Sequence, residues 1–347
     1  MDNRKKKVCI LYTGGTIGMI PSEQGYVPAQ GKLKMVLDGV QAMHHPDLPE
    51  WDLIEFSPLL DSSDIAVREW NEMGRTIARL YQGYDGFVVL HGTDTMAYSA
   101  STLSFMLEGL TKPVIFTGSQ LPIGIPRTDG KENLISAVEI AAAKDESGHA
   151  LVPEVCICFD NVLIRGNRSR KFNSDNFRAF RSEDYPPLAE AGISIRYNTP
   201  LIRKPSSWEE KPIFHTSLDT RVSILKIHPG ITPGVVRDIL LGKETRAVIL
   251  ETYGAGNAPS KDWFLSIVRE AADSGKIILN VTQCVAGCVN MDLYATGKSL
   301  KSAGVVNGYD STTESALGKL FYLLGTFDSN DKVKECLEMD LRGEISK

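Results

Sequence analysis

The feature that most constrains the fold of this chain is a series of short apolar runs, each closed by small or polar residues. Four such runs occupy residues 7–13 (KVCILYT), 86–92 (GFVVLHG), 113–119 (PVIFTGS) and 154–160 (EVCICFD). An unbroken apolar run bounded by turn residues is typical of a strand buried on both faces. These runs therefore predict the strands of a sheet covered on both sides.

Segments with helical periodicity separate these expected strands. Residues 68–81, 95–110 and 133–144 are of helix length, and the first of them has apolar side chains three or four residues apart, at Trp70, Met73, Ile77 and Leu80. That spacing places the side chains on one face of a helix. Strands that alternate with helices predict an α/β fold with a mainly parallel sheet and right-handed crossovers.

The chain is expected to form two domains. Its 347 residues match about two domains of roughly 150 residues. Residues 196–216 (RYNTPLIRKPSSWEEKPIFHT) contain three prolines and dense charge, which predicts a linker. Alternation then resumes, with strands in SILKIHP, AVILETYG and KIILNVTQ, helices near 233–241 and 260–274, and a last helix opened by a Ser311–Glu314 capping box. We predict a larger N-terminal catalytic domain, 1–195, and a smaller C-terminal α/β domain, 217–347.

Charge and hydropathy argue against two classes of protein. The 38 basic and 43 acidic residues give a net charge of −5, and no long basic run is present, which disfavours a nucleic-acid binder. No stretch approaches the ~20 apolar residues that span a bilayer, so no membrane partner is expected.

The cysteines and the N-terminus bear on the compartment. Lys5 to Lys7 and the following apolar residues resemble the start of a secretory signal, but the run ends at Thr13-Gly14-Gly15, short of the ~7–15 residues required. The six cysteines fit no disulfide framework or zinc motif, and we expect buried reduced thiols. The expected location is the cytoplasm.

Clusters of small polar residues follow three of the expected strands. Residues 13–18 (TGGTIG) are compatible with a plain turn, with a phosphate-binding loop or with a nucleophile presented at a strand end; the spacing of a nucleotide-binding motif is missing. In residues 91–95 (HGTDT), Thr93 or Asp94 would cap the next helix or hold the amine and carboxylate of a small substrate. Residues 61–64 (DSSD), taken alone, indicate a helix-capping loop.

Five motifs in order give the chain a specific resemblance. TGGTIG, HGTDTMAYSAS, TGSQLP, RGNRSRK and YGAGNAP follow one another at these separations. With them the chain resembles the bacterial type I (cytoplasmic) L-asparaginases over nearly its whole length, from Lys7 to about Gly343. The resemblance implies hydrolysis of L-asparagine to L-aspartate and ammonia through a threonine-linked acyl-enzyme.

The resemblance also implies roles for particular residues. Thr16 is the expected nucleophile, and Tyr26, on a mobile loop just after it, is expected to assist. Thr93, Asp94 and Lys171 are the expected catalytic relay. The expected substrate contacts are made by Asp61, Ser62, Ser63, Thr93, Asp94, Ser119 and Asn257.

The residue types suit this chemistry. A threonine hydroxyl needs a nearby base to take its proton. An ordinary lysine amine, with a pKa of about 10.4, acts as a base at neutral pH only when burial or a cationic environment lowers that value, whereas Asp94 would favour the charged ammonium. The residues alone leave open which of these opposing effects decides the charge of Lys171 beside Thr93 and Asp94. Acyl transfer of this kind needs no metal and no organic cofactor.

Two positions depart from the family pattern. No motif identifies the acidic partner of Tyr26. Some type I enzymes have a second, regulatory asparagine site built from a TQC segment and an arginine; Thr282-Gln283-Cys284 is present, but Glu251 stands where the arginine is expected. A carboxylate there would repel the carboxylate of an effector, so we predict weak or absent activation by asparagine.

Two other functions remain as alternatives. One is the amidase subunit of a tRNA-dependent amidotransferase, and the other is a non-catalytic amino-acid-binding protein. Because the resemblance implies that Asn257 reaches a neighbouring subunit's site, a homodimer or tetramer is expected. Glutaminase side activity, the affinity for asparagine and the choice between dimer and tetramer are not readable from the sequence.

Overall fold

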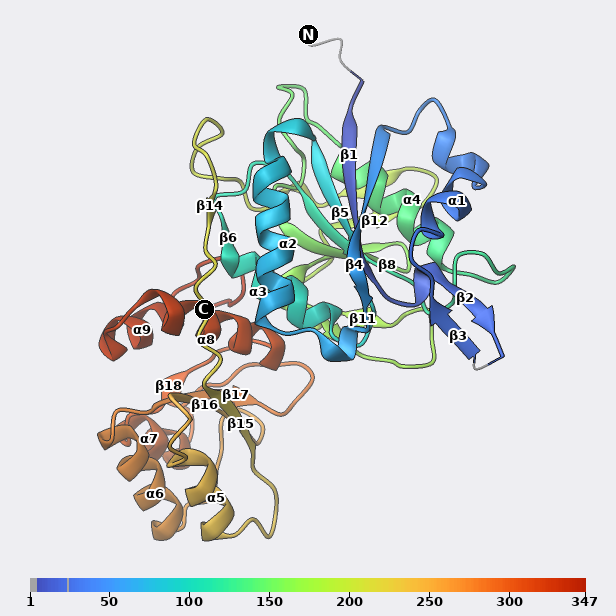
Figure 1. Ribbon diagram of the computed structural model, residues 1–347. Coiled ribbons are helices and arrows are strands. Elements are labelled where there is room, and N and C mark those ends of the chain that lie inside the picture. The colour runs from blue at the N-terminus through green and yellow to red at the C-terminus, as the bar shows by residue number, and fades with distance from the viewer. Residues whose placement is uncertain (1–4, 24) are drawn as a thin grey trace. The chain divides into compact units, whose positions relative to one another are not determined.

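The computed structural model describes residues 5–23 and 25–347. These residues divide into two compact units, the first ending at Thr216 and the second spanning Ser217–Lys347 (Figure 1). Both units combine a sheet with helices, as the alternation predicted. Among the described residues, no helix has the length and apolar character needed to cross a membrane.

An eight-stranded, mainly parallel sheet forms the centre of the first unit, in the order β13-β12-β9-β8-β7-β5-β1-β4. Its strands are β1 (Lys7–Gly14), β4 (Glu50–Leu60), β5 (Gly86–Leu90), β7 (Val114–Thr117), β8 (Val155–Phe159), β9 (Val162–Arg165), β12 (Ala189–Ala191) and β13 (Ile195–Tyr197). The five strands from β4 to β8 run parallel, while β9, β12 and β13 add antiparallel pairs. The parallel part confirms the predicted fold class.

The direction in which the sheet grows reverses at β1. From β1 the chain passes to β4 on one side and then returns to β5 on the other. Such a reversal opens a crevice outside the carboxyl ends of the strands, where ligands bind in open α/β sheets. The TGGTIG residues begin at this end of β1.

Helices cover both faces of this sheet. They are α1 (Leu33–Asp38), α2 (Val67–Leu80), α3 (Met96–Met106) and α4 (Gly130–Ala141). Figure 1 shows α2 and α3 on the face away from α1 and α4. The expected helix at 95–110 ends at Met106, because residues 107–108 form the short strand β6 (Leu107–Glu108), which pairs with β14 (Ile213–Phe214).

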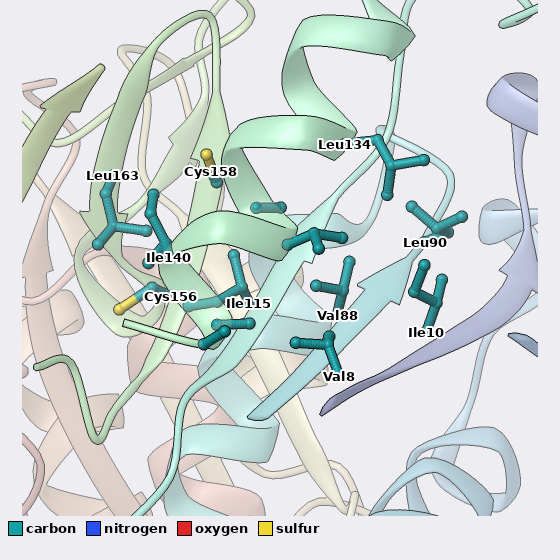
Figure 2. Close-up of a cluster of buried hydrophobic side chains, with 14 of the residues drawn as sticks. Val8, Ile10, Val88, Leu90, Ile115, Leu134, Ile140, Cys156, Cys158 and Leu163 are labelled. Carbon is teal, nitrogen blue, oxygen red and sulfur yellow. The ribbon is translucent and has the colours of Figure 1, made fainter. Parts of the chain in front are cut away.

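Alternate residues of the strands pack against α4. Figure 2 shows side chains from β1, β5 and α4 meeting in one buried cluster: Val8, Ile10, Val88, Leu90, Leu134 and Ile140. Fully burying a side chain of this size stabilises the fold by about 1.5–3 kcal/mol. This cluster supports the strands whose carboxyl ends carry the polar motifs.

Residues 196–216, expected to form a linker, belong to the first unit. Arg203 N donates to Glu154 Oε1 at 2.6 Å, and Arg165, which pairs with Glu154, donates to Leu201 O at 2.8 Å. Glu154 and Arg165 are almost fully buried, so breaking this pair would leave a buried charge uncompensated. The segment is therefore packed into the first unit. Its prolines and charges had indicated a linker, which the structure does not show there.

The second unit has a four-stranded parallel sheet in the order β15-β16-β17-β18. Its strands are β15 (Val222–Lys226), β16 (Ala247–Thr252), β17 (Ile277–Thr282) and β18 (Val306–Asn307). Its helices are α5 (Pro233–Leu240), α6 (Asp262–Asp273), α7 (Ala295–Ser302), α8 (Thr313–Thr326) and α9 (Asn330–Leu337). Of these helices, α7 and α9 were not predicted from the sequence.

Two local expectations were wrong. The N-cap of α8 is Thr312, whose side chain accepts from Ser315 N, so the helix does not begin with Ser311 as its cap. Cys284 and Cys288 are exposed, whereas the other four cysteines are buried as expected.

Candidate active site

Three loops meet where β1, β4 and β5 end. Gly15 has a left-handed φ of 90°, and a Cβ atom there would lie 2.5 Å from the backbone nitrogen of Gly92. A Cβ atom on Gly92 would in turn lie 2.5 Å from Ser62 Oγ. Only glycine permits such close approach, so these two residues let the loops carrying Thr16, Thr93 and Ser62 contact one another directly.

Thr16 begins a single turn of 3-10 helix, η1 (Thr16–Gly18), and is half-buried. The turn is anchored behind Thr16, because Ile17 is fully buried and its carbonyl oxygen accepts from Ile123 N at 3.0 Å. Thr16 is thus presented from a fixed backbone at the end of the central strand.

Lys171 joins the two polar residues that follow β5. Its Nζ donates to Thr93 Oγ1 at 2.8 Å and to Asp94 Oδ1 at 2.6 Å. Lys171 lies on the short strand β10 (Arg170–Lys171), which pairs with β11 (Phe180–Arg181). The Lys171 side chain is 18% exposed and that of Asp94 70% exposed, so water screens the carboxylate end of the ion pair.

Neither Thr93 nor Asp94 caps the next helix. The N-cap of α3 is Thr95, and its hydroxyl donates to Ser62 O at 2.6 Å instead of bonding the helix end. This contact ties the loop after β5 to the loop after β4. The capping interpretation of Thr93 and Asp94 was therefore wrong.

The DSSD loop contains a local cap of its own. Asp61 is the N-cap of η3 (Ser62–Asp64) and accepts from Ser63 N at 2.9 Å and from Ser63 Oγ at 2.8 Å. The bond from the Ser63 backbone is the main reason that the pKa of Asp61 lies below its ordinary value. Asp61 and Ser63 are exposed, whereas Ser62 is buried against Gly92.

The TGSQLP loop also packs against the residues after β5. A Cβ atom on Gly118 would lie 2.5 Å from His91 O. Ser119 is 1% exposed, and its hydroxyl donates to Leu121 O, so the donor of this predicted substrate contact is engaged inside its own loop.

Gln120 is a site residue that sequence reasoning missed. Thr93 Oγ1 donates to Gln120 Oε1 at 3.2 Å, which makes Gln120 a direct neighbour of the lysine-threonine pair. The motif TGSQLP contained the signal, but only its serine was considered.

Tyr26 lies on a hairpin that follows Thr16. The hairpin consists of β2 (Met19–Ser22) and β3 (Gly25–Pro28), with Tyr26 opposite Pro21 and 47% exposed. A two-stranded hairpin is marginally stable by itself, which suits a segment that changes position.

His91 is a neutral, buried histidine. Its Nδ1 lies 2.7 Å from Gly92 O, and because a carbonyl oxygen only accepts, Nδ1 carries the hydrogen. Nε2 is buried without a hydrogen-bond partner among the described residues. Burial lowers the pKa of His91 to about 4, so the ring supports the loop without carrying charge at neutral pH.

Asn257 belongs to the second unit. It forms a bridge with Tyr253, and its Oδ1 accepts from Thr296 Oγ1 at 2.6 Å. These contacts fix the YGAGNAP turn after β16.

Glu251, on β16, faces the start of α8. Its Oε1 accepts from Thr313 Oγ1 at 2.6 Å, and its Oε2 lies 3.7 Å from Lys226 Nζ. The Gln283 side chain donates to the backbone oxygens of Glu251 and Ile227. A resident carboxylate therefore occupies the position at a helix N-terminus that favours anions.

Within residues 5–23 and 25–347, no group of three or more His, Cys, Asp or Glu side chains is arranged to hold a metal ion. The polar groups that meet at the carboxyl ends of β1, β4 and β5 are hydroxyls, a carboxylate, an amine and an amide. Such a set can position a small polar molecule and move a proton.

Two family models match the chain. The model described as "Asparaginase, N-terminal" matches residues 7–203, and that described as "Glutaminase/Asparaginase C-terminal domain" matches residues 221–337. The two matches fall in the two compact units.

Whole-chain comparisons give the same result. The chain is 45% identical over 344 residues to L-asparaginase 1 of Escherichia coli K12, covering 99% of both chains. It is 41% identical to the mouse 60 kDa lysophospholipase, of which it covers 63%. The crystal structure of L-asparaginase I from Vibrio cholerae superposes with a TM-score of 0.91 at 41% identity, over 99% of this chain and 100% of that one. The chain belongs to the asparaginase family.

Proposed function

We propose that this protein hydrolyses L-asparagine to L-aspartate and ammonia. The observation that carries the proposal is the hydrogen-bonded group of Lys171, Thr93 and Asp94, on loops packed against the turn that presents Thr16. Family membership and the names of two of its relatives support the same activity.

Thr16 is the proposed nucleophile. Its Oγ1 forms a bond to the side-chain amide carbon of asparagine, the C–N bond breaks, and the threonine proton leaves with the ammonia. Water then attacks the acyl ester, releases aspartate and returns a proton to Thr16 Oγ1. Fixed backbone N–H groups near Thr93 and in the glycine loop are the proposed donors to the developing oxyanion, where losing one donor typically costs ~10²–10³ in rate.

A proton relay is proposed for Lys171, Thr93 and Asp94, which would take a proton from the nucleophile or from the attacking water. Lys171 Nζ lies 2.8 Å from Thr93 Oγ1, so once Nζ presents a lone pair to Thr93 in place of its N–H, it can accept the hydroxyl proton over that distance. Asp94 Oδ1 accepts from the same Nζ at 2.6 Å, which holds Lys171 beside Thr93. General acid–base catalysis by such a group contributes about 10²–10⁴ in rate.

The remaining predicted residues bind substrate in this proposal. Asp61, Ser62, Ser63 and Ser119 lie on the loops after β4 and β7, with Thr93 and Asp94 between them in the sheet order. The Tyr26 hairpin closes over the bound substrate and excludes water. Asn257 reaches the site of a neighbouring subunit, so the protein acts as a homodimer or tetramer. We also propose a cytoplasmic location.

The test is ammonia release from L-asparagine by the purified protein and its variants. Thr16→Ala and Thr93→Ala should each abolish turnover, and Thr199→Ala, an exposed threonine on η6 (Thr199–Leu201), should leave it unchanged. Ammonia release at the wild-type rate in both site variants would refute the proposal. Asparagine binding by calorimetry without turnover would favour an amino-acid-binding protein, and turnover only with charged tRNA and a partner would favour an amidotransferase subunit.

A further inference from the structure

Gln120 connects the two elements of the proposed relay. Its Oε1 accepts from Thr93 Oγ1 at 3.2 Å. Its Nε2 donates to Asn176 O at 3.2 Å and to Ser174 O at 3.4 Å, in the loop of residues 172–179 that directly follows Lys171. One amide therefore contacts both Thr93 and the loop that continues from the lysine.

These partners determine how the Gln120 amide is oriented. Two backbone carbonyl oxygens face Nε2, and they can only accept, so the nitrogen must lie on that side and Oε1 on the side of Thr93. A carbonyl oxygen cannot donate, so the Thr93 hydroxyl is the donor in its contact with Gln120. The lone pairs of Thr93 Oγ1 are then left to accept from Lys171 Nζ.

The hydrogen bonds consequently run in one direction. Lys171 donates to Thr93, Thr93 donates to Gln120, and Gln120 donates to Asn176. For Lys171 to take the hydroxyl proton, Nζ must present a lone pair to Thr93 in place of its N–H, and the proton must turn away from Gln120 toward that lone pair. Gln120 thus fixes the resting direction of the Thr93 proton and helps to set the distance between Thr93 and Lys171.

The backbone of Gln120 is itself held in place. Its N–H lies 3.0 Å from each carboxylate oxygen of Asp129, and Leu121 N donates to the same carboxylate at 3.2 Å. Asn133, on α4, donates to Asp129 and to Gly118 O. Because a carboxylate forms strong bonds to backbone N–H groups, the amide of Gln120 extends from a rigid base.

We propose that Gln120 is a positioning residue for the reaction, acting through Thr93 and Lys171 without touching the reacting bond. The inference rests on the proposed function, because it assigns Thr93 and Lys171 to proton transfer. It adds a specific role for the glutamine of TGSQLP: setting the hydroxyl direction and anchoring the loop after Lys171.

Two variants of Gln120 separate positioning from simple structural support. Gln120→Met keeps the length and removes both polar contacts, so kcat for asparagine should fall about 10–100-fold with a much smaller change in KM. Gln120→Glu keeps an acceptor for Thr93 but adds a negative charge beside the relay, so the rate lost at neutral pH should return at higher pH. Gln82→Met, an exposed glutamine on η4 (Tyr81–Gly83), is the matched control.

A second measurement does not depend on turnover. NMR of protein carrying ¹³C-labelled lysine should show the Lys171 amine titrating at higher pH in Gln120→Glu than in the wild type, with no such change in Gln82→Met. An unchanged Lys171 titration, or a Gln120→Met enzyme with wild-type kcat and pH profile, overturns the inference. A wild-type protein that releases no ammonia from asparagine refutes the proposed function, while the NMR titration still tests the contact between Gln120 and the relay.

Discussion

Acidification should destabilise the first unit through His91. Burial lowers the pKa of His91 in the folded protein to about 4, from about 6.5 when the chain is unfolded. Between these two values the unfolded chain binds a proton and the folded chain does not. Stability is therefore lost as the pH falls from about 6.5 to about 4, and at one pKa unit per 1.36 kcal/mol the full loss is about 3 kcal/mol.

The geometry explains why His91 resists protonation. The Nδ1 hydrogen already bonds Gly92 O, so a second proton must go to Nε2, which is buried and has no acceptor among the described residues. Creating a charge there costs desolvation energy that no partner repays. The effect belongs to this one side chain and is removed by replacing it.

The assay is urea unfolding followed by tryptophan fluorescence, because Trp51, Trp70 and Trp208 report on the first unit and one further tryptophan on the second. His91→Asn retains a donor for Gly92 O but does not titrate, so its unfolding free energy should fall with acid by about 3 kcal/mol less than that of the wild type. His45→Asn, whose wild-type side chain is 60% exposed, should behave like the wild type. Equal acid sensitivity of His91→Asn and the wild type would refute the reasoning.

Three further predictions follow from other contacts. Glu344→Gln should lower the unfolding free energy of the second unit by about 3–5 kcal/mol in urea titrations, because it leaves the buried Lys319 ammonium without its carboxylate; a loss below about 1 kcal/mol would contradict this. Lys171→Met should reduce kcat for asparagine by about 10²–10⁴, and Asp94→Asn by less, since Asp94 is exposed; equal losses would count against this ranking. Rate against asparagine concentration should be hyperbolic, because the Glu251 carboxylate occupies the anion position at the start of α8, and a sigmoidal curve would overturn this.

The parallel part of the fold was predictable because each buried strand leaves an unbroken apolar run. β5, β7 and β8 fall inside the runs at 86–92, 113–119 and 154–160, and β1 matches KVCILYT to within one residue. The antiparallel extension was not predictable in this way. β12 and β13 are three residues each, too short to show a pattern, and they are held in the sheet by pairing with β9 and with each other.

Tertiary contacts also account for the error over residues 196–216. Prolines and charges indicate an exposed connection when each residue is considered alone. In the structure this segment contacts a buried carboxylate. Glu154 binds Arg165 and also accepts from the backbone N–H of Arg203, which lies forty-nine positions after Glu154 in the sequence. Nothing local to residues 196–216 reveals that partner. The same limit applies to Gln120, whose contacts with Thr93 and Asn176 are made across 27 and 56 positions of sequence.

The loops after β4 and β5 both have polar residues where a helix cap is expected, but only the first of them uses those residues as a cap. Asp61 caps its turn by accepting from Ser63 N and Ser63 Oγ, so these contacts stabilise the loop that carries both residues. Thr93 and Asp94 stand in an equally plausible capping position, yet Thr95 takes the N-cap place and bonds Ser62 O. The side chains of Thr93 and Asp94 instead accept hydrogen bonds from Lys171. A polar residue at the start of a helix that binds a lysine and leaves the helix N–H groups to other acceptors is better explained by chemistry than by folding. Substituting Thr93 should therefore reduce kcat for asparagine far more than it reduces the free energy of unfolding of the same variant.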